Sequence, residues 1–483
     1  MKPIKKILIA NRGEIARRIM RTARTMGISC VAIYEQEDHD ALYVREADAA
    51  YILHDGYLDQ DRILEICAAE KVDAIHPGYG FLSENSAFVR RVEKAGITFI
   101  GPSADAMDRM GEKTSARAEA RAASVPLLPG EELEDGAVLD STARRQLVEK
   151  IGVPVVLKAS AGGGGKAQAI IEDISEIDAA FDKVLREAER LYRSRSLVAE
   201  RYLAKARHIE VQVLGNAAGK NFSLFDRDCS AQRNNQKIIE EAPAPGVPDK
   251  IRAELHASAI RLANHVGYSN AGTMEYLYDS HRQEFYFLEM NTRLQVEHTV
   301  TEMITGLDLV REQILIAQGA ITDYSAVTCT GHSLQARVCA EKSDGTWQPS
   351  TGEILQYSEP ALVRIDSGVA AGQKISGKYD NMIAKVIVHA PDREAAMDQL
   401  HTALGHYVIN GIHTNIPLLR QLLRDPVFRE VRHYTRYLQK EFAPPQNNPA
   451  LAAAIAAIAL YQTELQENQE RFGSLAGFTN TIQ

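Results

Sequence analysis

The chain has 483 residues, of which 45% are hydrophobic and 25% charged, and its formal net charge is -9. This length predicts about two to four domains rather than one core, and the acidic balance argues against a general nucleic-acid or anionic-membrane binder. Five scattered cysteines without a CxxC pair indicate reduced thiols and no zinc site. The longest apolar run, residues 451–461, is about half as long as a membrane span. We therefore expect a cytoplasmic protein with no role at membranes.

Predicted strands and helices alternate over the first 112 residues, as in a parallel α/β unit. Strands are expected at 6–10, 30–34, 72–76 and 97–101, and helices at 14–26 and 85–95. The turn after the first strand reads NRGE rather than G-x-G-x-x-G, so the dinucleotide fingerprint is absent. A second turn, HPGYG, follows a strand at the edge where open α/β sheets bind ligands. A plain tight turn has the same composition, and the sequence leaves that alternative open.

Four consecutive glycines, 162–165, separate two predicted strands in the next part of the chain. Glycines allow backbone N–H groups to approach phosphate oxygens, and the flanking Lys158 and Lys166 supply positive charge. The pattern is not G-x-x-x-x-G-K-[ST], so it is not a P-loop. A flexible hairpin tip is an equally simple interpretation. Further on, charged residues are packed closely between 226 and 237, and such a run is usually a solvated face.

The stretch FYFLEMNTRLQVEH, residues 285–298, alternates apolar and polar residues and predicts an extended segment. One face carries Glu289, Asn291, Arg293, Gln295 and Glu297. Oxygen ligands such as Glu289 and Asn291 suit Mg²⁺, the planar fork of Arg293 suits an oxyanion, and Glu297 beside that anion could act as a base. The wet face of an edge strand gives the same alternation.

Six motifs in one order resemble those of the biotin carboxylase component of biotin-dependent carboxylases, an ATP-grasp family. They are KILIANRGEIA, HPGYGFLSEN, KASAGGGGK, RDCSAQRNNQKIIEEAPAP, EMNTRLQVEH and TEMITGLDLV. The resemblance covers residues 4 to about 440 and implies a mixed α/β (α+β) fold. The implied parts are a Rossmann-like pre-ATP-grasp domain at 1–112, an ATP-grasp domain at 113–330 with a mobile lid at about 132–202, a C-terminal biotin carboxylase domain at 331–440, and a linker and helical tail at 441–483.

The same resemblance assigns roles to individual positions. The implied ATP contacts are Lys113, Lys158, Gly163, Gly164, Gly165, Glu200, Leu203, His208, Gln232, Asn235, Glu275 and Glu289. The implied metal ligands are Glu275, Glu289 and Asn291. The implied bicarbonate and biotin contacts are Lys237, Arg293, Gln295, Val296 and Tyr79. Among these, Lys237 and Arg293 would also act in catalysis, with Glu297 as the general base and Arg337 stabilising the biotin enolate.

The implied reaction is ATP-dependent carboxylation of biotin by bicarbonate through carboxyphosphate, with Mg²⁺ or Mn²⁺ as the cation. No biotinyl-lysine motif (AMKM) is present, so biotin is expected on a carrier protein or domain in another chain or in a missing part. A carboxyltransferase subunit is a second expected partner, and family members form homodimers.

Several positions depart from the family pattern. Ala167 and Gln168 replace a usual Gly-Met, Asn234 a usual arginine, Thr299 a proline, Gln335 a glutamate, and Lys342-Ser343 an Asp-Pro. None removes a proton-transfer or metal residue, so we predict activity with weakened or altered nucleotide binding. Two alternatives stay open: a divergent ATP-grasp ligase, and a catalytically weak regulatory or assembly subunit that has kept the fold.

Overall fold

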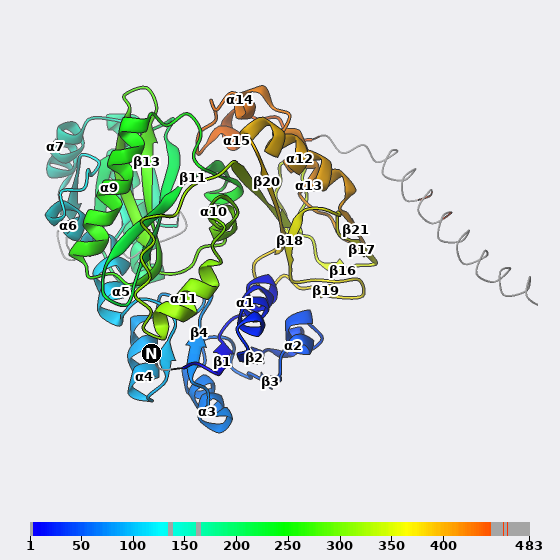
Figure 1. Ribbon diagram of the computed structural model, residues 1–483. Coiled ribbons are helices and arrows are strands. Elements are labelled where there is room, and N and C mark those ends of the chain that lie inside the picture. Colours follow the sequence, from blue (N-terminus) through cyan, green and yellow to red (C-terminus); the bar gives the residue numbers. More distant parts are fainter. Residues whose placement is uncertain (1–2, 134–138, 161–165, 446–456, 458–460, 462–483) are drawn as a thin grey trace, which may run out of the picture.

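The computed structural model describes residues 3–133, 139–160, 166–445, 457 and 461. Its described part contains three larger sheets with helices packed around them (Figure 1). No helix among the described residues is both long and apolar enough to cross a membrane.

The N-terminal unit is a five-stranded parallel sheet, which confirms the predicted alternation of strands and helices. Its strands, in the order in which they lie side by side, are β3 (Ala49–Ile52), β2 (Ser29–Tyr34), β1 (Lys6–Ile9), β4 (Ala74–His76) and β5 (Thr98–Phe99). The unit also contains α1 (Gly13–Thr25), α2 (Leu42–Glu46), α3 (Gln60–Glu70), α4 (Ser86–Lys94) and α5 (Ala104–Gly111). The turns after β1 and β4 meet because Asn11 Nδ2 donates hydrogen bonds to the carbonyls of Pro77 and Tyr79, both at 2.7 Å.

A separate four-stranded sheet, together with two helices alongside it, contains most of the residues predicted to form the lid. Its order is β6 (Gly130–Leu133), β9 (Leu197–Arg201), β7 (Val155–Ala159) and β8 (Gln168–Ile171), with α7 (Ser141–Ile151) and α8 (Ile177–Tyr192) alongside. Gly163, Gly164 and Gly165 fall between β7 and β8 and lie outside the described residues. Their predicted contact with phosphate therefore stays a prediction.

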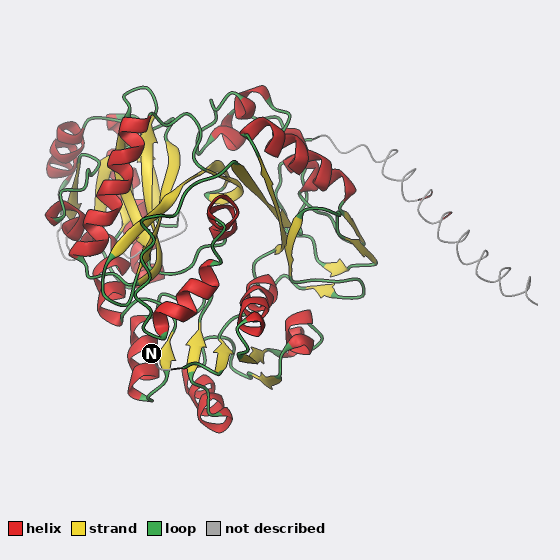
Figure 2. Ribbon diagram, viewed as in Figure 1, coloured by secondary structure: helices red, strands yellow, loops and turns green. Residues whose placement is uncertain are grey.

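An eight-stranded antiparallel sheet forms the centre of the molecule and crosses the expected boundary at residue 330 (Figure 2). Its order is β14 (Glu284–Asn291), β13 (Asn270–Asp279), β10 (Arg207–Gly215), β11 (Asn221–Arg233), β12 (Gln236–Ala242), β15 (His332–Cys339), β20 (Met382–Ala390) and β18 (Arg364–Ser367). The junction is the pairing of β12 with β15, in which Glu240 lies opposite Gln335. The ATP-grasp and C-terminal parts thus share one hydrogen-bonded frame.

Helices and two short ribbons complete the described fold. The helices are α6 (Lys113–Ala122), α9 (Asp249–His265), α10 (His298–Thr305), α11 (Leu309–Ala317), α12 (Arg393–His406), α13 (Ile416–Leu422), α14 (Pro426–Arg429) and α15 (Tyr437–Lys440). The ribbons pair β16 (Gly352–Glu353) with β19 (Lys374–Ile375), and β17 (Gln356–Ser358) with β21 (Val408–Asn410). Helix α9 packs on β10 and β11, α12 packs on β15 and β20, and α10 contacts strands from both halves of the large sheet.

The extended segment predicted over 285–298 ends earlier than expected. Strand β14 ends at Asn291, and α10 begins at His298. Contacts with the N-terminal unit explain the change: the backbone N–H of Thr292 donates to Glu84 Oε1 at 3.1 Å, and Leu294 is fully buried in the hydrophobic core beside β1 and α1. The polar residues from 289 to 297 therefore do not share one strand face. They come together through a bend in the chain.

Candidate active site

A cavity of about 840 Å³, the central cavity, is lined by residues of the N-terminal unit, the lid and the large sheet. Among the described residues predicted for the site, only Glu200 is absent from its lining. The others that line it are Tyr79, Lys113, Lys158, Leu203, His208, Gln232, Asn235, Lys237, Glu275, Glu289, Asn291, Arg293, Gln295, Val296, Glu297 and Arg337. Residues spread over more than 250 positions of sequence thus meet in one place, because the sheet strands and the bend after β14 bring them together.

Lys237 lies among three carboxylates in the middle of the site. Its Nζ lies 2.6 Å from Glu297 Oε1, 2.7 Å from Glu210 Oε2 and 2.9 Å from Glu275 Oε1. Burial by itself lowers the pKa of Lys237, but the three carboxylates raise it well above its ordinary value. The side chain is therefore an ammonium that holds three acidic groups together.

Glu297 is fixed between two cations. In addition to Lys237, Arg337 Nη2 donates to Glu297 Oε2 at 3.0 Å. Burial raises the pKa of Glu297, but the charges of Lys237 and Arg337 outweigh it and hold the pKa below its ordinary range. Glu297 is thus a carboxylate, the form that a general base needs.

Arg337 is itself held by a residue that the sequence reasoning did not find. Its Nε donates to Glu240 Oε1, and Glu240 is fully buried on the neighbouring strand β12. Burial and the nearby Glu297 raise the pKa of Glu240, whereas Arg337 lowers it. In the sequence, Glu240 is recognisable only as an acidic residue on the strand that begins beside Lys237.

Glu275 and Glu289 are directly opposite each other on β13 and β14. Burial, and next the charge of Glu275, raise the pKa of Glu289 above its ordinary value, so the pair favours a bound cation. Two carboxylates facing one cavity are a ligand set that Mg²⁺ accepts. The Asn291 amide oxygen accepts a hydrogen bond from Arg293 Nη2 at 2.7 Å, which leaves its second lone pair for the predicted metal.

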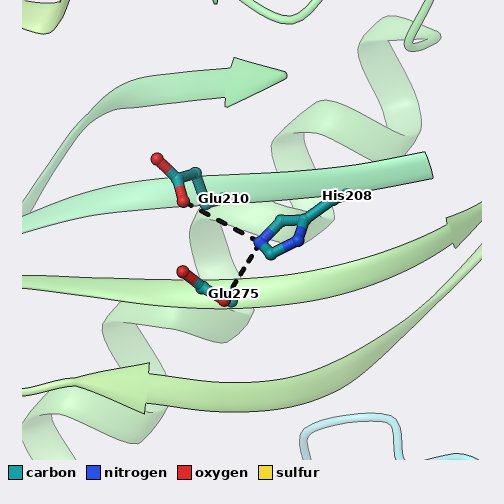
Figure 3. A group of neighbouring side chains, drawn as sticks. All are labelled: His208, Glu210 and Glu275. Atoms are coloured by element: carbon teal, nitrogen blue, oxygen red, sulfur yellow. Dashed lines mark ion pairs between the residues drawn. The ribbon is translucent and has the colours of Figure 1, made fainter. Parts of the chain in front are cut away.

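His208 lies beside the same pair and forms a further cluster with acidic residues (Figure 3). His208 Nε2 lies 3.0 Å from Glu275 Oε2 and 3.9 Å from Glu210 Oε2. Burial lowers the pKa of His208, but the charge of Glu275 raises it above its ordinary value overall. The contact with Glu275 orients that carboxylate toward the middle of the site.

The predicted bicarbonate residues line the same cavity as Glu297. Arg293 Nε donates to Glu84 Oε2 at 2.9 Å. Gln295 Nε2 donates to Glu275 Oε1 at 2.7 Å, and its Oε1 accepts from Arg227 Nη2 at 2.8 Å. The backbone carbonyl of Val296 accepts from Lys385 Nζ at 3.1 Å.

Arg227 shows that the interpretation of the charged run as a solvated face is wrong for part of that run. Its side chain is fully buried, and it donates to Gln212 Oε1 at 2.7 Å and to Thr301 Oγ1 at 2.9 Å. It also bonds Glu210, which it holds against Lys237. The partners come from β10 and α10, so the hydrogen bonding of this buried guanidinium becomes visible only in the folded chain.

The lid side of the cavity carries Lys113 and Lys158. Burial lowers the pKa of Lys113. Lys158 Nζ lies 2.8 Å from Glu200 Oε2, and Arg117 contacts the other oxygen of Glu200. The side chain of Glu200, predicted to contact ATP, is therefore turned to these cations rather than to the cavity.

The structure shows the conformation or contacts of three positions that depart from the family pattern, Ala167, Gln168 and Asn234. Ala167 is buried and has a backbone φ of 49°, a left-handed conformation that glycine adopts more easily. Gln168 lines the cavity and pairs with Lys158 across β7 and β8. Asn234 Oδ1 accepts from Gln439 Nε2 at 2.8 Å, which ties the β11–β12 turn to α15.

Tyr79 lies at the end of the cavity that the N-terminal unit provides. Its hydroxyl donates to Glu14, and Glu14 Oε1 lies 3.2 Å from Lys385 Nζ. Gln232, another residue of the lining, lies with its Nε2 3.0 Å from His208 Nδ1. Lys385 in turn lies opposite Arg337 across β15 and β20. The cavity is thus divided into a lid end with lysines and an opposite end with Tyr79 and Arg337.

Three family models match successive parts of the chain. Biotin carboxylase, N-terminal domain, matches residues 3–107; carbamoyl-phosphate synthase L chain, ATP binding domain, matches 112–323; and biotin carboxylase C-terminal domain matches 335–440.

Curated relatives agree with these matches. Biotin carboxylase 2 of Bacillus subtilis is 44% identical over 444 residues, which are 90% of this chain and 99% of that protein. The α subunit of mitochondrial methylcrotonoyl-CoA carboxylase of Arabidopsis thaliana is 42% identical over 467 residues. The match covers 93% of this chain but 63% of the plant subunit.

Solved structures show the same similarity. A biotin carboxylase–β-γ-ATP complex from Campylobacter jejuni has a TM-score of 0.87 and 40% identity over 91% of this chain and 99% of its own. The biotin carboxylase domain dimer of Hydrogenobacter thermophilus 2-oxoglutarate carboxylase, in complex with MgADP, ADP and bicarbonate, has a TM-score of 0.87 and 40% identity over 91% of this chain and 98% of its own.

Proposed function

Since the chain belongs to the biotin carboxylase family, which carboxylates biotin with ATP and bicarbonate, we propose that the residues of the central cavity divide this reaction as follows. The observation that carries the proposal is the Glu297 carboxylate held between Lys237 and Arg337, beside the Glu275–Glu289 pair. Biotin carboxylase models match both ends of the chain, which favours this reaction over a different ATP-grasp ligase.

The first step activates bicarbonate. Glu297 takes the bicarbonate proton, and Arg293 and Lys237 hold the resulting anion by charge. The oxyanion attacks the γ-phosphorus of ATP, the bond to the β-phosphate oxygen breaks, and ADP leaves as carboxyphosphate forms. Positioning and charge neutralisation carry most of the catalysis in phosphoryl transfer, which suits a site built from fixed ion pairs.

Lys113 and Lys158 are placed to neutralise the phosphates at the lid end. Glu275 and Glu289 would hold Mg²⁺, or Mn²⁺ with the same oxygen ligands, and the cation would neutralise phosphate charge. Lys158 is paired with Glu200 in this structure, so we propose that a nucleotide phosphate competes with Glu200 for this ammonium.

The second step transfers the carboxyl group. Carboxyphosphate breaks into CO₂ and phosphate, the phosphate takes the proton of the biotin ureido nitrogen, and that nitrogen attacks CO₂. Negative charge develops on the ureido oxygen, where the Arg337 guanidinium stabilises it. Tyr79 lies at the same end of the cavity and contacts the biotin rings in this proposal.

We propose that biotin reaches the site on a carrier protein or domain, and that a carboxyltransferase subunit receives the carboxyl group. A relative of similar length in Methanothermobacter thermautotrophicus is named as one of the subunits of pyruvate carboxylase, which supports a multi-part assembly. The dimer of the Hydrogenobacter domain supports a homodimer for this chain.

The test is ADP release from Mg-ATP and bicarbonate, measured with and without free biotin. We expect biotin to accelerate ADP release and Glu297→Gln to abolish it, because the amide cannot accept the bicarbonate proton. Slow ADP release that ignores both biotin and bicarbonate in the wild-type chain would contradict the proposal.

A further inference from the structure

A closed ring of hydrogen bonds, here the arginine ring, connects Arg337 to helix α10. Thr299 Oγ1 donates to Gln335 Oε1, and Gln335 Nε2 donates to Glu240 Oε2 at 3.0 Å. Arg337 Nε donates to Glu240 Oε1, and Arg337 Nη2 donates to Glu297 Oε2 at 3.0 Å. Glu297 directly precedes α10, the helix that carries Thr299, so the chain itself closes the ring.

Burial makes every bond of this ring matter. Thr299, Gln335 and Glu240 are each 0% exposed, so water does not replace a lost partner. The Gln335 amide can satisfy both neighbours in one orientation only. If it were turned over, its oxygen would face the Glu240 carboxylate, and two acceptors would meet.

The ring also determines what Arg337 offers to a substrate. Its Nε and Nη2 are engaged by Glu240 and Glu297, while Nη1 forms no hydrogen bond with any residue that the structure describes. Arg337 lines the central cavity. The remaining N–H groups are thus presented by a guanidinium whose plane is fixed on two sides.

Both Thr299 and Gln335 are positions at which this sequence departs from the pattern it resembles, which has proline and glutamate there. The two departures are chemically matched. A proline at 299 has neither a hydroxyl nor a backbone N–H to donate. A glutamine donates through its nitrogen and leaves an oxygen that requires a donor, which the Thr299 hydroxyl supplies.

We propose that Thr299 and Gln335 are positioning residues that act as a matched pair, holding Glu240 so that it fixes Arg337 for the biotin half of the reaction. The inference rests on the proposed function, because it assigns the effect to the step in which Arg337 meets biotin. Lys237 holds the other oxygen of Glu297 from outside the ring, so we expect activation of bicarbonate to depend much less on Thr299 and Gln335 than the biotin step does.

The experiment compares ADP release with and without free biotin in Thr299→Val, which removes the hydroxyl and keeps the shape. We expect biotin-stimulated ADP release to fall about fivefold, as for the loss of one buried hydrogen bond. The biotin-independent, bicarbonate-dependent rate should stay within about twofold of wild type. Thr299→Ser keeps the hydroxyl and should retain the biotin-stimulated rate, since it still donates to Gln335.

The matched control is Thr305→Val, which makes the same change on the same helix, where the hydroxyl bonds only α10's own Thr301 carbonyl and a neighbouring backbone N–H. Gln335→Met breaks the ring at a second point and should cause the same selective loss, so the test does not depend on one variant folding. Equal loss of both rates, no loss in either Thr299→Val or Gln335→Met, or a loss in Thr299→Ser equal to that in Thr299→Val overturns the inference. Failure of the proposed function differs from all of these, because the wild-type chain itself would then ignore biotin.

Discussion

The Nζ atom of Lys237 lies 2.6 Å from Oε1 of Glu297, so the proposed base and its nearest cation form one buried ion pair. The same nitrogen also contacts Glu210 and Glu275. A single side chain therefore connects the proposed cation ligand Glu275 to the proposed base Glu297. Substrate anions that enter the cavity have to compete with these carboxylates for Lys237.

Lys237→Met tests this connection. Without the ammonium, burial raises the pKa of Glu297, and a larger fraction of it is protonated and inactive as a base. We expect bicarbonate-dependent ADP release to fall by at least about 100-fold and the free energy of unfolding to drop by about 3 kcal/mol, as for a buried ion pair that loses one partner. Steady-state kinetics and chemical denaturation measure the two effects. Lys237→Arg keeps the charge and should retain more activity; equal activity in Met and Arg variants would contradict the expectation.

Glu289→Gln tests the proposed cation site. The change removes one carboxylate of the pair, so we expect the Mg²⁺ concentration for half-maximal ADP release to rise at least about tenfold. The raised pKa of Glu289 means that its ionised form is less favourable in the folded chain than in the unfolded chain. The metal-free variant should therefore be no less stable than wild type at neutral pH. Glu284→Gln, at the exposed start of the same strand, is the control and should leave the Mg²⁺ requirement unchanged.

Glu241 gives an acid-sensitive contribution to stability. Burial raises its pKa, but Arg393 and His332 outweigh this and lower the pKa to about 2. A carboxyl group whose pKa is lower in the folded chain stabilises the folded chain at pH values above the pKa that the group has in the unfolded chain. This stabilisation is lost as the pH falls toward 2. We expect wild type to exceed Glu241→Gln in free energy of unfolding by about 3 kcal/mol at pH 7, with the difference shrinking below about pH 5. Denaturation at a series of pH values measures it, and a difference that is constant with pH would exclude this origin.

Ala167→Gly tests the predicted change in nucleotide binding. Glycine adopts the positive φ of this position without strain. If the strain of Ala167 is present only in the closed lid, its release by about 1 kcal/mol corresponds to roughly fivefold tighter ATP binding. Calorimetric titration with Mg-ATP measures the dissociation constant. Arg193→Gly is the matched control: its φ is 53° in the same lid, at the end of α8, away from the cavity lining. The same change in affinity in both variants would show that lid strain in general, and not the hinge beside Gln168, is responsible.

Local patterns were enough for four strands of the N-terminal sheet, whereas β3, which pairs with β2 at its edge, was not expected. Alternation fixes which residues can share a strand face, but it does not give the register between strands. The opposition of Glu275 to Glu289 therefore became visible only in the fold. The bend after Asn291 was missed because it depends on contacts with Glu84, about 200 residues earlier in the chain.

The residues that sequence reasoning missed have a common physical feature. Glu210, Arg227 and Glu240 are buried charges whose partners lie on other strands or on α10. In a single sequence such residues look like ordinary surface charges, because burial and pairing are set by the tertiary structure. The predicted roles of the cavity residues come from the family resemblance and remain predictions, although the fold gathers nearly all the described ones around one cavity.

The pairing of β12 with β15 has a consequence for any attempt to divide this chain near residue 330. A cut there would leave one fragment ending its sheet at β12 and the other beginning its sheet at β15, each with an uncovered row of backbone N–H and C=O groups. Such open edges are templates for intermolecular pairing. Separately expressed halves should therefore aggregate when alone and reassemble when refolded together, which makes this seam a natural place for a split reporter rather than for isolating domains.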